Sequence, residues 1–423
     1  MREMKNSGIE WIGEIPCDWK IERLQWHLSE IKVSNNPIQT EQVLSLTNKL
    51  GVIPYEEKGN QGNKSKTNYS EYKLAYPGTI VANSMNIIIG SVGISKYFGC
   101  VSPAYYVFKP NQGENLGFIN YVMQVQGFQR ELRKYANGIL EIRLRVSADN
   151  ILKRPIMFPS MDEQIAITRF LDIKCAEIDS LQMDIQKEIE TLEQYRSSII
   201  SETVTHGLNT NNIIFKESGI SWVKSLPSSW KVIPAKYLFH NSDVRRHPDD
   251  ELLTASQKYG IITQDEYMTR ENSAIVLANK GLDNWKHVVP NDFIISLRSF
   301  QGGLEMSETT GCITWHYVVL KASKKIYHPY FKWLFKSAQY INALQGTCNF
   351  IRDGQDLRFS NFAQVPLFEP PYQEQKEIAD YLDEKCAEID KIINDKQSQL
   401  EKIEAYKKSL IYEYVTGKKE VPA

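Results

Sequence analysis

The 423-residue sequence lacks the features that mark secreted, disulfide-bonded and membrane proteins. Its six cysteines never occur as C-x-x-C, so neither a zinc site of that kind nor a disulfide framework is predicted. No apolar run approaches the roughly 20 residues that span a bilayer. The N-terminal segment Met-Arg-Glu-Met-Lys-Asn-Ser-Gly has no apolar stretch of the kind found in secretory signals. We therefore expect a cytoplasmic protein that has no membrane contact.

Motifs for catalysis are also missing. Glu369-Pro370-Pro371-Tyr372 resembles the [D/N]-P-P-[Y/F] loop of amino-methyltransferases, but it begins with Glu and directly precedes a predicted helix, where proline commonly marks the entry. Residues 59–65 do not have the spacing of a phosphate loop, and Pro248-Asp249 is not followed by the (D/E)-x-K of a nuclease. The seven histidines do not occur at metal-ligand spacing. We predict no catalytic residue, no metal site and no cofactor bound by this chain.

The overall charge excludes little. Lys and Arg number 50 and Asp and Glu 51, so the net charge of −1 does not by itself indicate a nucleic-acid partner. A hydrophobic content of 42% is enough for packed cores and excludes wholesale disorder. The length predicts about three domains, or two large ones.

An internal repeat defines the organisation of the chain. FLDIKCAEID at 170–179 returns as YLDEKCAEID at 381–390, an offset of 211. The same offset relates S-G-I-x-W at 7–11 to 218–222, P-x-x-W-K at 16–20 to 227–231, and the Pro, Pro and Glu-Gln of 155–164 to those of 366–375. Cys175 and Cys386, inside the repeated C-A-E-I-D, are interpreted as small buried helix residues. The repeated tryptophans are likewise interpreted as packing anchors.

Each copy ends in a predicted long helix, at 162 to about 202 and at 373 to about 414, because neither stretch contains Gly or Pro. At about 1.5 Å per residue, each helix is roughly 60 Å long. An apolar stripe repeats every seven residues, and Lys396 interrupts it in the second copy. The residues assigned to helix pairing or partner docking are Leu171, Ile178, Ile185, Leu192, Tyr195, Ile199, Leu382, Ile389, Ile403, Tyr406 and Leu410.

The fold class that follows is mixed α/β (α+β), with two pseudo-symmetric repeats. Residues 79–108 and 293–320 are rich in β-branched and aromatic residues with interspersed glycine, which predicts strands, and helices are expected at 117–135 and 330–344. We assign globular domains to 1–158 and 208–369, and helical spacers to 159–207 and 370–423. A two-fold relation between the copies requires the long helices to pair as an antiparallel coiled coil. It also predicts that the chain ends lie close together, as in a ring.

The charge is divided between the parts. Residues 161–205 have ten acids and four bases, and residues 373–423 have twelve acids and nine bases. These helical segments therefore have net charges of −6 and −3, which leaves +8 for the globular parts of a chain whose net charge is −1. Two basic lobes on an acidic spacer suit two separated stretches of a DNA duplex. A coiled-coil scaffold whose lobes bind protein is the alternative.

Together these motifs resemble the specificity subunits of type I restriction–modification systems. The resemblance includes the S-G-I-x-W-x4-P-x2-W opening of each copy, the Pro-x3-Pro-x3-Glu-Gln that leads into each helix, and the Tyr-(Arg/Lys)-x-Ser-(Ile/Leu)-Ile at 195–200 and 406–411. It spans the whole chain. P-G-T-I-V at 77–81 is similar to the target recognition domains of that family, and residues 290–303 resemble another branch of them.

The resemblance implies a non-catalytic, sequence-specific DNA-binding subunit. Each globular domain would be a recognition domain that binds one half of an asymmetric bipartite site in double-stranded DNA. The helices would dock two modification (methyltransferase) subunits, and restriction (motor-nuclease) subunits would join them, so that this chain directs both methylation and restriction. S-adenosylmethionine, ATP and magnesium are expected on the partner subunits.

Candidate DNA contacts are basic or amide residues, because Lys and Arg neutralise phosphates and Arg, Lys, Asn and Gln hydrogen-bond base edges. For each of them, a polar surface residue is the alternative interpretation. In the first copy the candidates are Lys64, Lys66, Asn83, Asn86, Arg133, Arg143 and Arg145. In the second copy they are Lys258, Arg298, Gln301, Arg352 and Arg358.

Overall fold

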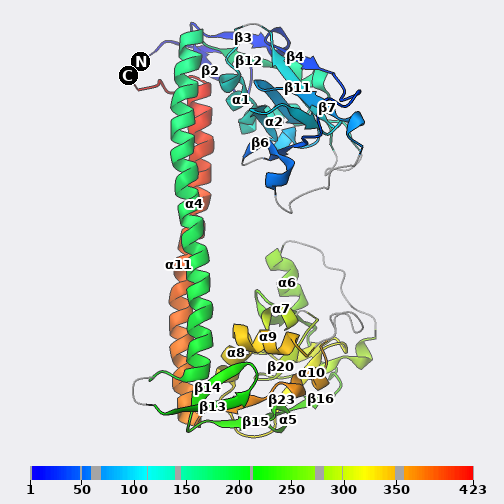
Figure 1. The fold of residues 1–423 in the computed structure, drawn as a ribbon, viewed down its shortest axis with the longest axis vertical. Coiled ribbons are helices and arrows are strands. Elements are labelled where there is room, and N and C mark those ends of the chain that lie inside the picture. The colour runs from blue at the N-terminus through cyan, green and yellow to red at the C-terminus, as the bar shows by residue number, and fades with distance from the viewer. Residues whose placement is uncertain are drawn as a thin grey trace. The chain divides into compact units, whose positions relative to one another are not determined.

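The computed structural model describes residues 2–47, 50–58, 68–111, 113–138, 144–209, 213–271, 281–297, 299–347 and 357–422. The chain divides into two compact units, the first formed by Met1–Ile185 and Ser398–Ala423 and the second by Gln186–Gln397. Each unit contains a globular part and one portion of each of two long helices (Figure 1). This grouping divides both long helices, so the assignment of separate helical spacer domains stays a prediction.

The first unit is built on a four-stranded antiparallel sheet with four two-stranded pairs around it. The sheet order is β4 (Leu28–Ile31), β11 (Tyr105–Pro110), β8 (Thr79–Asn83) and β9 (Val92–Ser95). The pairs are β1 (Met4–Asn6) with β2 (Glu14–Pro16), β3 (Lys20–Arg23) with β12 (Pro155–Phe158), β5 (Leu44–Thr47) with β6 (Gly51–Pro54), and β7 (Lys73–Ala75) with β10 (Gly99–Val101).

The second unit has a counterpart for every one of these sheets. Its four-stranded antiparallel sheet has the order β16 (Phe239–Ser242), β23 (Val318–Ala322), β20 (Phe293–Ile295) and β21 (Glu305–Met306). Its pairs are β13 (Phe215–Ile220) with β14 (Val223–Pro227), β15 (Lys231–Ile233) with β24 (Leu367–Glu369), β17 (Leu253–Ser256) with β18 (Gly260–Thr263), and β19 (Lys286–Val288) with β22 (Gly311–Ile313). The predicted mixed α/β repeats, with strands in 79–108 and 293–320, are confirmed.

The short helices differ from the prediction in one respect. Residues 117–135 form two helices, α1 (Leu116–Gln124) and α2 (Gln126–Arg133), because Val125 adopts an extended conformation. The same break separates α8 (His328–Lys336) from α9 (Ala338–Gln345) at Ser337. The Ser337 side chain accepts a hydrogen bond from the Tyr340 backbone nitrogen and thereby caps the second helix. The remaining helices of the globular parts are α3 (Ala148–Leu152), α5 (Ala235–Leu238), α6 (Gln264–Glu271), α7 (Ser299–Gly302) and α10 (Phe359–Gln364).

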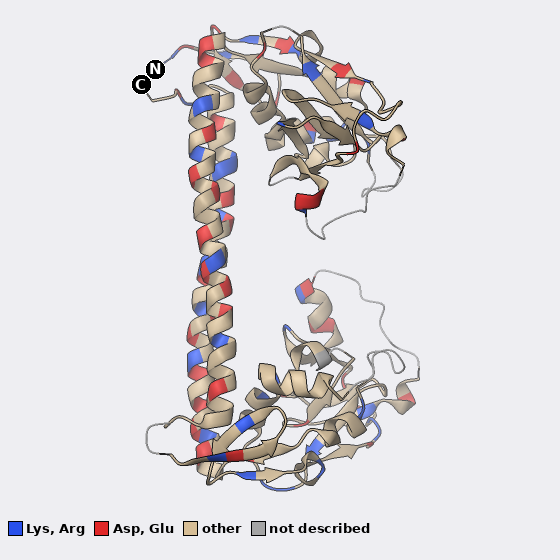
Figure 2. Ribbon diagram, in the orientation of Figure 1, with Lys and Arg blue, Asp and Glu red and all other residues tan. Residues whose placement is uncertain are grey.

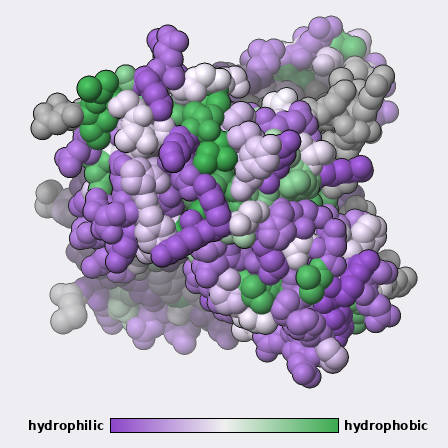
Figure 3. Space-filling model, turned by 90° about the horizontal axis from the view of Figure 1, so that it is seen from below, coloured by the Kyte–Doolittle hydropathy of each residue, from purple (hydrophilic) through white to green (hydrophobic). Residues whose placement is uncertain are grey.

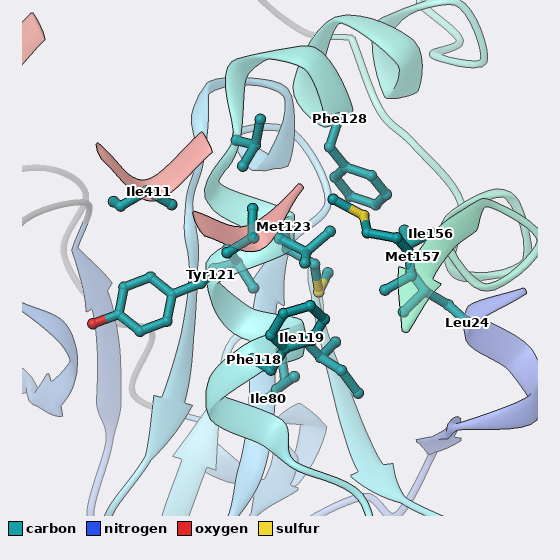
Figure 4. Packing of buried hydrophobic residues seen from close by; sticks show 14 of the residues in the cluster. Leu24, Ile80, Phe118, Ile119, Tyr121, Met123, Phe128, Ile156, Met157 and Ile411 are labelled. Carbon is teal, nitrogen blue, oxygen red and sulfur yellow. The ribbon is translucent and has the colours of Figure 1, made fainter. Parts of the chain in front are cut away.

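The core of each unit includes residues from the long helices. These helices are α4 (Met161–His206) and α11 (Tyr372–Val415), close to the predicted bounds. Figure 4 shows Ile411 of α11 beside the residues of α1 that fill the first core, such as Met123. The second core contains Val204 of α4 and Leu382 of α11. Burial of these apolar side chains fixes each helix end to its globular part.

Repeated hydrogen bonds join each globular part to the start of its long helix. The Trp19 indole nitrogen donates to Glu163 at 2.9 Å, and the Trp230 indole nitrogen donates to Glu374 at 3.0 Å. Both tryptophans are fully buried, which confirms that they are packing anchors. Tyr121 donates to Asp172 and Trp333 donates to Asp383, again 211 residues apart, although the donor has changed. Duplication has therefore preserved the frame of the fold.

The long helices pair antiparallel in both units. In the first unit Phe170 of α4 stacks on Tyr414 of α11, and further along α4 Asp179 bonds Lys407. In the second unit Glu188 of α4 bonds Lys396 of α11. Partner numbers on α11 fall as those on α4 rise, so the predicted antiparallel pairing is confirmed. Figure 2 shows charged residues of both signs along both helices.

The apolar stripe is only partly buried. Six of its predicted members are buried, namely Leu171, Ile178, Ile185, Leu382, Ile389 and Leu410. Leu192, Ile199 and Ile403 are half-buried. Tyr195 and Tyr406 are more than half exposed, at 57% and 58%, and so contribute little to the helix core. Where the stripe was expected to break, Lys396 is half-buried and forms its ion pair with Glu188.

Both chain ends lie in the first unit and are close together (Figure 1). Lys418, just after α11, donates from Nζ to the Glu14 carbonyl at 2.6 Å, and Val421 packs against the first core. The predicted proximity of the ends is confirmed. In the described residues, no helix is both long and apolar enough to cross a membrane.

Candidate nucleic-acid interface

Five of the twelve predicted DNA contacts lie outside the described residues. They are Lys64, Lys66, Arg143, Arg298 and Arg352. The other seven can be placed, and they fall into two groups of neighbours and two residues that stand apart.

In the first unit, three predicted residues meet at one end of strand β8. Asn83 is buried, and its side chain accepts a hydrogen bond from the Met85 backbone nitrogen at 3.0 Å, so it shapes the turn. Asn86, in the same turn, is exposed. The next residue after Arg145, Val146, donates its backbone N–H to the Ser84 carbonyl at 3.0 Å, which holds the exposed Arg145 against this turn. Asn86 and Arg145 are therefore available to a ligand, and Asn83 positions their turn.

Arg133 is a separate feature. It is exposed in the last turn of α2, and this helix packs against the 3-10 helix Ile87–Ile89 that follows the Asn83–Asn86 turn. A basic residue in this last turn of α2 can contact phosphate, whereas base contacts need side chains that enter a groove.

In the second unit, Lys258 and Gln301 belong to neighbouring segments. Lys258 is exposed in the β17–β18 turn and bonds Glu271 at 3.1 Å. Gln301 is exposed in α7, and a Cβ atom on the next residue, Gly302, would lie 2.6 Å from the side chain of Gln257. The β17–β18 turn and α7 are thus in contact. Arg358, the N-cap of α10, is exposed elsewhere in this unit.

The positive charge of Lys258 is partly balanced by the neighbouring carboxylate of Glu271, a contact that the sequence could not reveal. Its ammonium group lies 4.7 Å from the centre of the Tyr259 ring, and the bonds to Tyr259 and Glu271 raise its pKa. Glu271 lies 13 residues further along and reaches Lys258 only because α6 folds back beside the hairpin.

The long helices expose apolar side chains that neither core covers. In the first unit these include Leu181, Met183 and Tyr406, which are 49%, 73% and 58% exposed. In the second unit they include Tyr195 and Ile392. By contrast, Figure 3 shows a mainly hydrophilic face on which apolar residues form small separate groups. The exposed tyrosines stand at equivalent positions of the repeat, 211 residues apart.

A cleft of about 850 Å³ lies in the first unit between α11 and the α1–α2 junction. Trp11, Arg130, Lys408 and Tyr412 are among its lining residues, together with several acidic side chains. The Tyr412 hydroxyl lies 3.4 Å from the Trp11 carbonyl at its edge. Sequence analysis missed this cleft because its walls come from segments that are distant along the chain.

The buried cysteines and the Pro-Pro segment have structural roles. Cys175 and Cys386 are buried in the two cores, and burial raises the pKa of both thiols, that of Cys386 to about 11. At the start of α11, the Gln375 side chain donates to the Pro370 carbonyl at 2.8 Å, just as Gln164 donates to Pro159 at the start of α4. This repeated bond makes Pro370 part of the entry into α11, as Pro159 is part of the entry into α4.

The chain is similar to a curated protein along nearly its whole length. No family model matches the chain. A putative type I restriction enzyme MjaX specificity subunit of Methanocaldococcus jannaschii is 22% identical over 432 residues, which cover 96% of this chain and 95% of the relative.

One solved structure shares the fold over nearly the whole chain. A chain from a structure of complex assembly and conformational transition of the type I R-M system has a TM-score of 0.67 at 11% identity, and the match covers 95% of this chain and 98% of that one. The HsdS subunit of Thermoanaerobacter tengcongensis matches with a TM-score of 0.48 at 12% identity, with coverage of 95% and 98%.

The duplicated lobe-and-helix fold is therefore one that occurs in type I restriction–modification assemblies. The particular family expected from the motifs, the type I specificity subunits, is confirmed as the one this chain resembles along its length.

Proposed function

We propose that this chain is the sequence-specific DNA-binding subunit of a type I restriction–modification complex. Each globular part binds one half of an asymmetric bipartite site, and the long helices dock two modification subunits. The observation that supports this most directly is the contrast between a preserved frame and different exposed residues. Trp19–Glu163 and Trp230–Glu374 are the same bond in both copies, whereas the exposed candidates differ between them.

Two similar frames with dissimilar surfaces suit two dissimilar half-sites. Asn86 and Arg145 in the first unit, and Lys258 and Gln301 in the second, are exposed side chains of the types that hydrogen-bond base edges. Their supporting turns are held by backbone hydrogen bonds or by close packing. An ordered turn of this kind can present a side chain to a groove without a further cost for ordering the backbone.

Two identical partners suit the helices. Tyr195 and Tyr406 are equivalent and exposed on α4 and α11, so each can belong to one of two equal docking surfaces. Aromatic residues are enriched in protein interfaces, because they bury a large area with few rotatable bonds. The partner subunits then supply methyl transfer with S-adenosylmethionine, and the restriction subunits supply ATP-driven cleavage with magnesium. This chain contributes recognition and no catalysis.

The experiment is co-expression with the cognate modification subunit in a methylation-free host, followed by mapping of methylated adenine by long-read sequencing. A single bipartite motif that disappears when this chain is omitted supports the proposal. Arg145→Ala is expected to relax or weaken only the first half-site, and Arg298→Ala only the second, by about 1–3 kcal/mol if each contacts a base pair. Lys153→Ala, an exposed substitution in the same first unit, is the matched control and should leave the motif unchanged.

A scaffold whose lobes bind protein is the second candidate, favoured by the exposed apolar residues of the helices. The salt dependence of binding separates the two functions, because duplex affinity falls steeply with salt through counterion release and protein docking does so much less. A complex that co-purifies but methylates no DNA, with binding insensitive to salt, contradicts the DNA-binding function.

A further inference from the structure

A second site of a different kind lies in the second unit, at the segment that follows β16. His247, Asp250 and His287 converge there, and one potential ligand atom from each lies within 4.8 Å of the other two. The His287 Nδ1 atom is 2.8 and 3.0 Å from the two carboxylate oxygens of Asp250. The imidazole rings of His247 and His287 stack with their centres 4.0 Å apart. Two imidazoles and one carboxylate therefore lie within reach of one another.

The duplicated copy indicates that the backbone pairing of this segment does not require these three residues. In both copies the segment pairs with the equivalent strand. In the first copy the Asn35 N–H donates to the Tyr72 carbonyl, and the Leu74 N–H donates to the Val33 carbonyl. In the second copy the Arg246 N–H donates to the Trp285 carbonyl, and the His287 N–H donates to the Val244 carbonyl. This alignment places Asn36, Gln39 and Leu74 where the second copy has His247, Asp250 and His287. The first copy forms the same backbone bonds with no imidazole or carboxylate there. The Asp250 carboxylate also accepts a hydrogen bond from the His247 backbone nitrogen at 2.7 Å and so helps to hold the turn, whereas the two imidazoles have no counterpart in the first copy.

We propose that His247, Asp250 and His287 bind a divalent first-row transition-metal ion, for which Zn²⁺ is the reference case. Nitrogen-rich ligands favour such ions over Mg²⁺ or Ca²⁺, which prefer oxygen. At metal–ligand distances of about 2.0–2.1 Å, ligand atoms of a tetrahedral zinc lie roughly 3.3 Å apart. Asp250 and His287, whose atoms are 2.8–3.0 Å apart, need to move by only a few tenths of an ångström to reach that separation, and side-chain rotation of the exposed His247 can bring in the third ligand.

This site could not be predicted from the sequence, because His287 is 40 residues from His247 and no spacing motif joins them. The proposal replaces our expectation that the chain has no metal site. Asp250 and the ring of His287 are only 4% and 12% exposed, whereas His247 is open to solvent. Three protein ligands and an open fourth position, filled by water, are the expected coordination. The bound ion would fasten the segment around Arg245 and Arg246 to strand β19.

The test uses the full-length chain without a polyhistidine tag, stripped with a chelator and then dialysed against a small excess of Zn²⁺. We expect about one zinc per chain by elemental analysis, and a higher melting temperature for the loaded than for the stripped protein. Loading with Co²⁺ should give visible absorption bands typical of a tetrahedral site. Asp250→Asn and His287→Gln should each abolish the bands and lower the stoichiometry to near zero.

His247→Ala gives a variant at an exposed position, so loss of metal there reflects loss of a ligand and not of folding; circular dichroism verifies this. His240→Ala is the matched control, because His240 is an exposed histidine of the same unit that bonds Ser323 at 3.0 Å. It should keep the full stoichiometry. Equal metal content in the parent chain and in the His247→Ala and His287→Gln double variant overturns the proposal, as does a melting temperature that zinc leaves unchanged.

Discussion

Arg196 on α4 forms an ion pair with Asp390 on α11, with Nε 3.0 Å from Oδ1. The equivalent residues of the other copy, Asp179 and Lys407, form the same pair with the helices exchanged, at 2.5 Å. Each pair lies inside its own unit. Because residues 211 apart exchange roles between α4 and α11, the two-fold relation that the sequence predicts is present in the side-chain contacts.

Both ion pairs are half-exposed, and we expect them to specify helix register more than stability. Double-mutant cycles with Arg196→Ala and Asp390→Ala, and with Asp179→Ala and Lys407→Ala, should give coupling energies of about 0.2–1 kcal/mol in urea unfolding. High salt should reduce them. The exposed pair Lys385–Glu388, within α11 alone, is the control and should couple by no more than about 0.5 kcal/mol. A coupling of several kcal/mol would mean that the pairs are effectively buried.

Gly303 is a position where only glycine fits. Its φ is +78°, and a Cβ atom there would lie 2.0 Å from the Phe335 carbonyl oxygen. Gly8 has a similar φ of +73° but no neighbouring atom within 4 Å. We expect Gly8→Ala to cost about 1 kcal/mol of unfolding free energy, from backbone strain alone. Gly303→Ala should cost roughly 1–3 kcal/mol more, because the α8–α9 junction must also move. Equal losses would contradict this account.

Acidification should weaken the second unit through His328. This residue begins α8, stacks on Phe293 with the ring centres 6.4 Å apart, and has its pKa lowered below 6.5 by burial, against an opposing effect of Asp292. The folded state thus favours the neutral ring, and the unfolded chain takes up the proton first as pH falls. The contribution to stability is complete above pH 6.5 and is lost as pH falls toward the lower folded pKa.

Denaturant unfolding of the parent chain and His328→Gln between pH 7.5 and about 5 measures this effect. The parent should lose more stability over that interval than the variant, whose side chain does not titrate. His240→Gln, an exposed control in the same unit, should follow the parent. Parallel curves for the parent and His328→Gln would show that His328 does not take part in the pH dependence.

The parts of the fold that could be predicted from the sequence are those set by local pattern and by the repeat. The long helices were foreseen from their lack of Gly and Pro, and their direction from the two-fold relation. The break at Val125 was not foreseen, because valine is not a residue that ends helices. Val125 is extended where α2 turns to pack on the 3-10 helix Ile87–Ile89. Tyr195 and Tyr406 were assigned to the stripe by spacing, which does not tell the buried edge of a stripe from its exposed edge.

The candidate interface was less predictable. Basic and amide residues can be listed from the sequence, but which of them share a surface depends on tertiary contacts. Arg145 reaches the Asn83–Asn86 turn because its neighbour Val146 bonds Ser84, across more than 60 residues, while its own backbone pairs with Asn137. Lys258 is held by Glu271 because α6 folds back. The convergence of His247 with His287 has the same origin.

A circular permutant tests the two-fold relation most directly. In the second unit, Gly207 directly follows α4, and its φ of +77° turns the chain beside Trp230 and toward strand β13. In the first unit, Gly417 lies two residues beyond the end of α11, with φ of +69°, beside Trp19. Residues 208–214 join helix to strand in one unit, and the two chain ends occupy the equivalent place in the other. A short linker between the ends should therefore be accommodated without strain.

We expect a chain opened within 208–214, with its original ends joined, to fold with unchanged helix content by circular dichroism and to direct methylation of the same bipartite motif. A matched control opens the chain inside α4, after Ile185, which should lower stability sharply because a buried helix is cut. If the 208–214 permutant is insoluble while the control folds, the ends and the linker are not equivalent. If both fold but only the parent directs methylation, the linker region has a function beyond closing the ring.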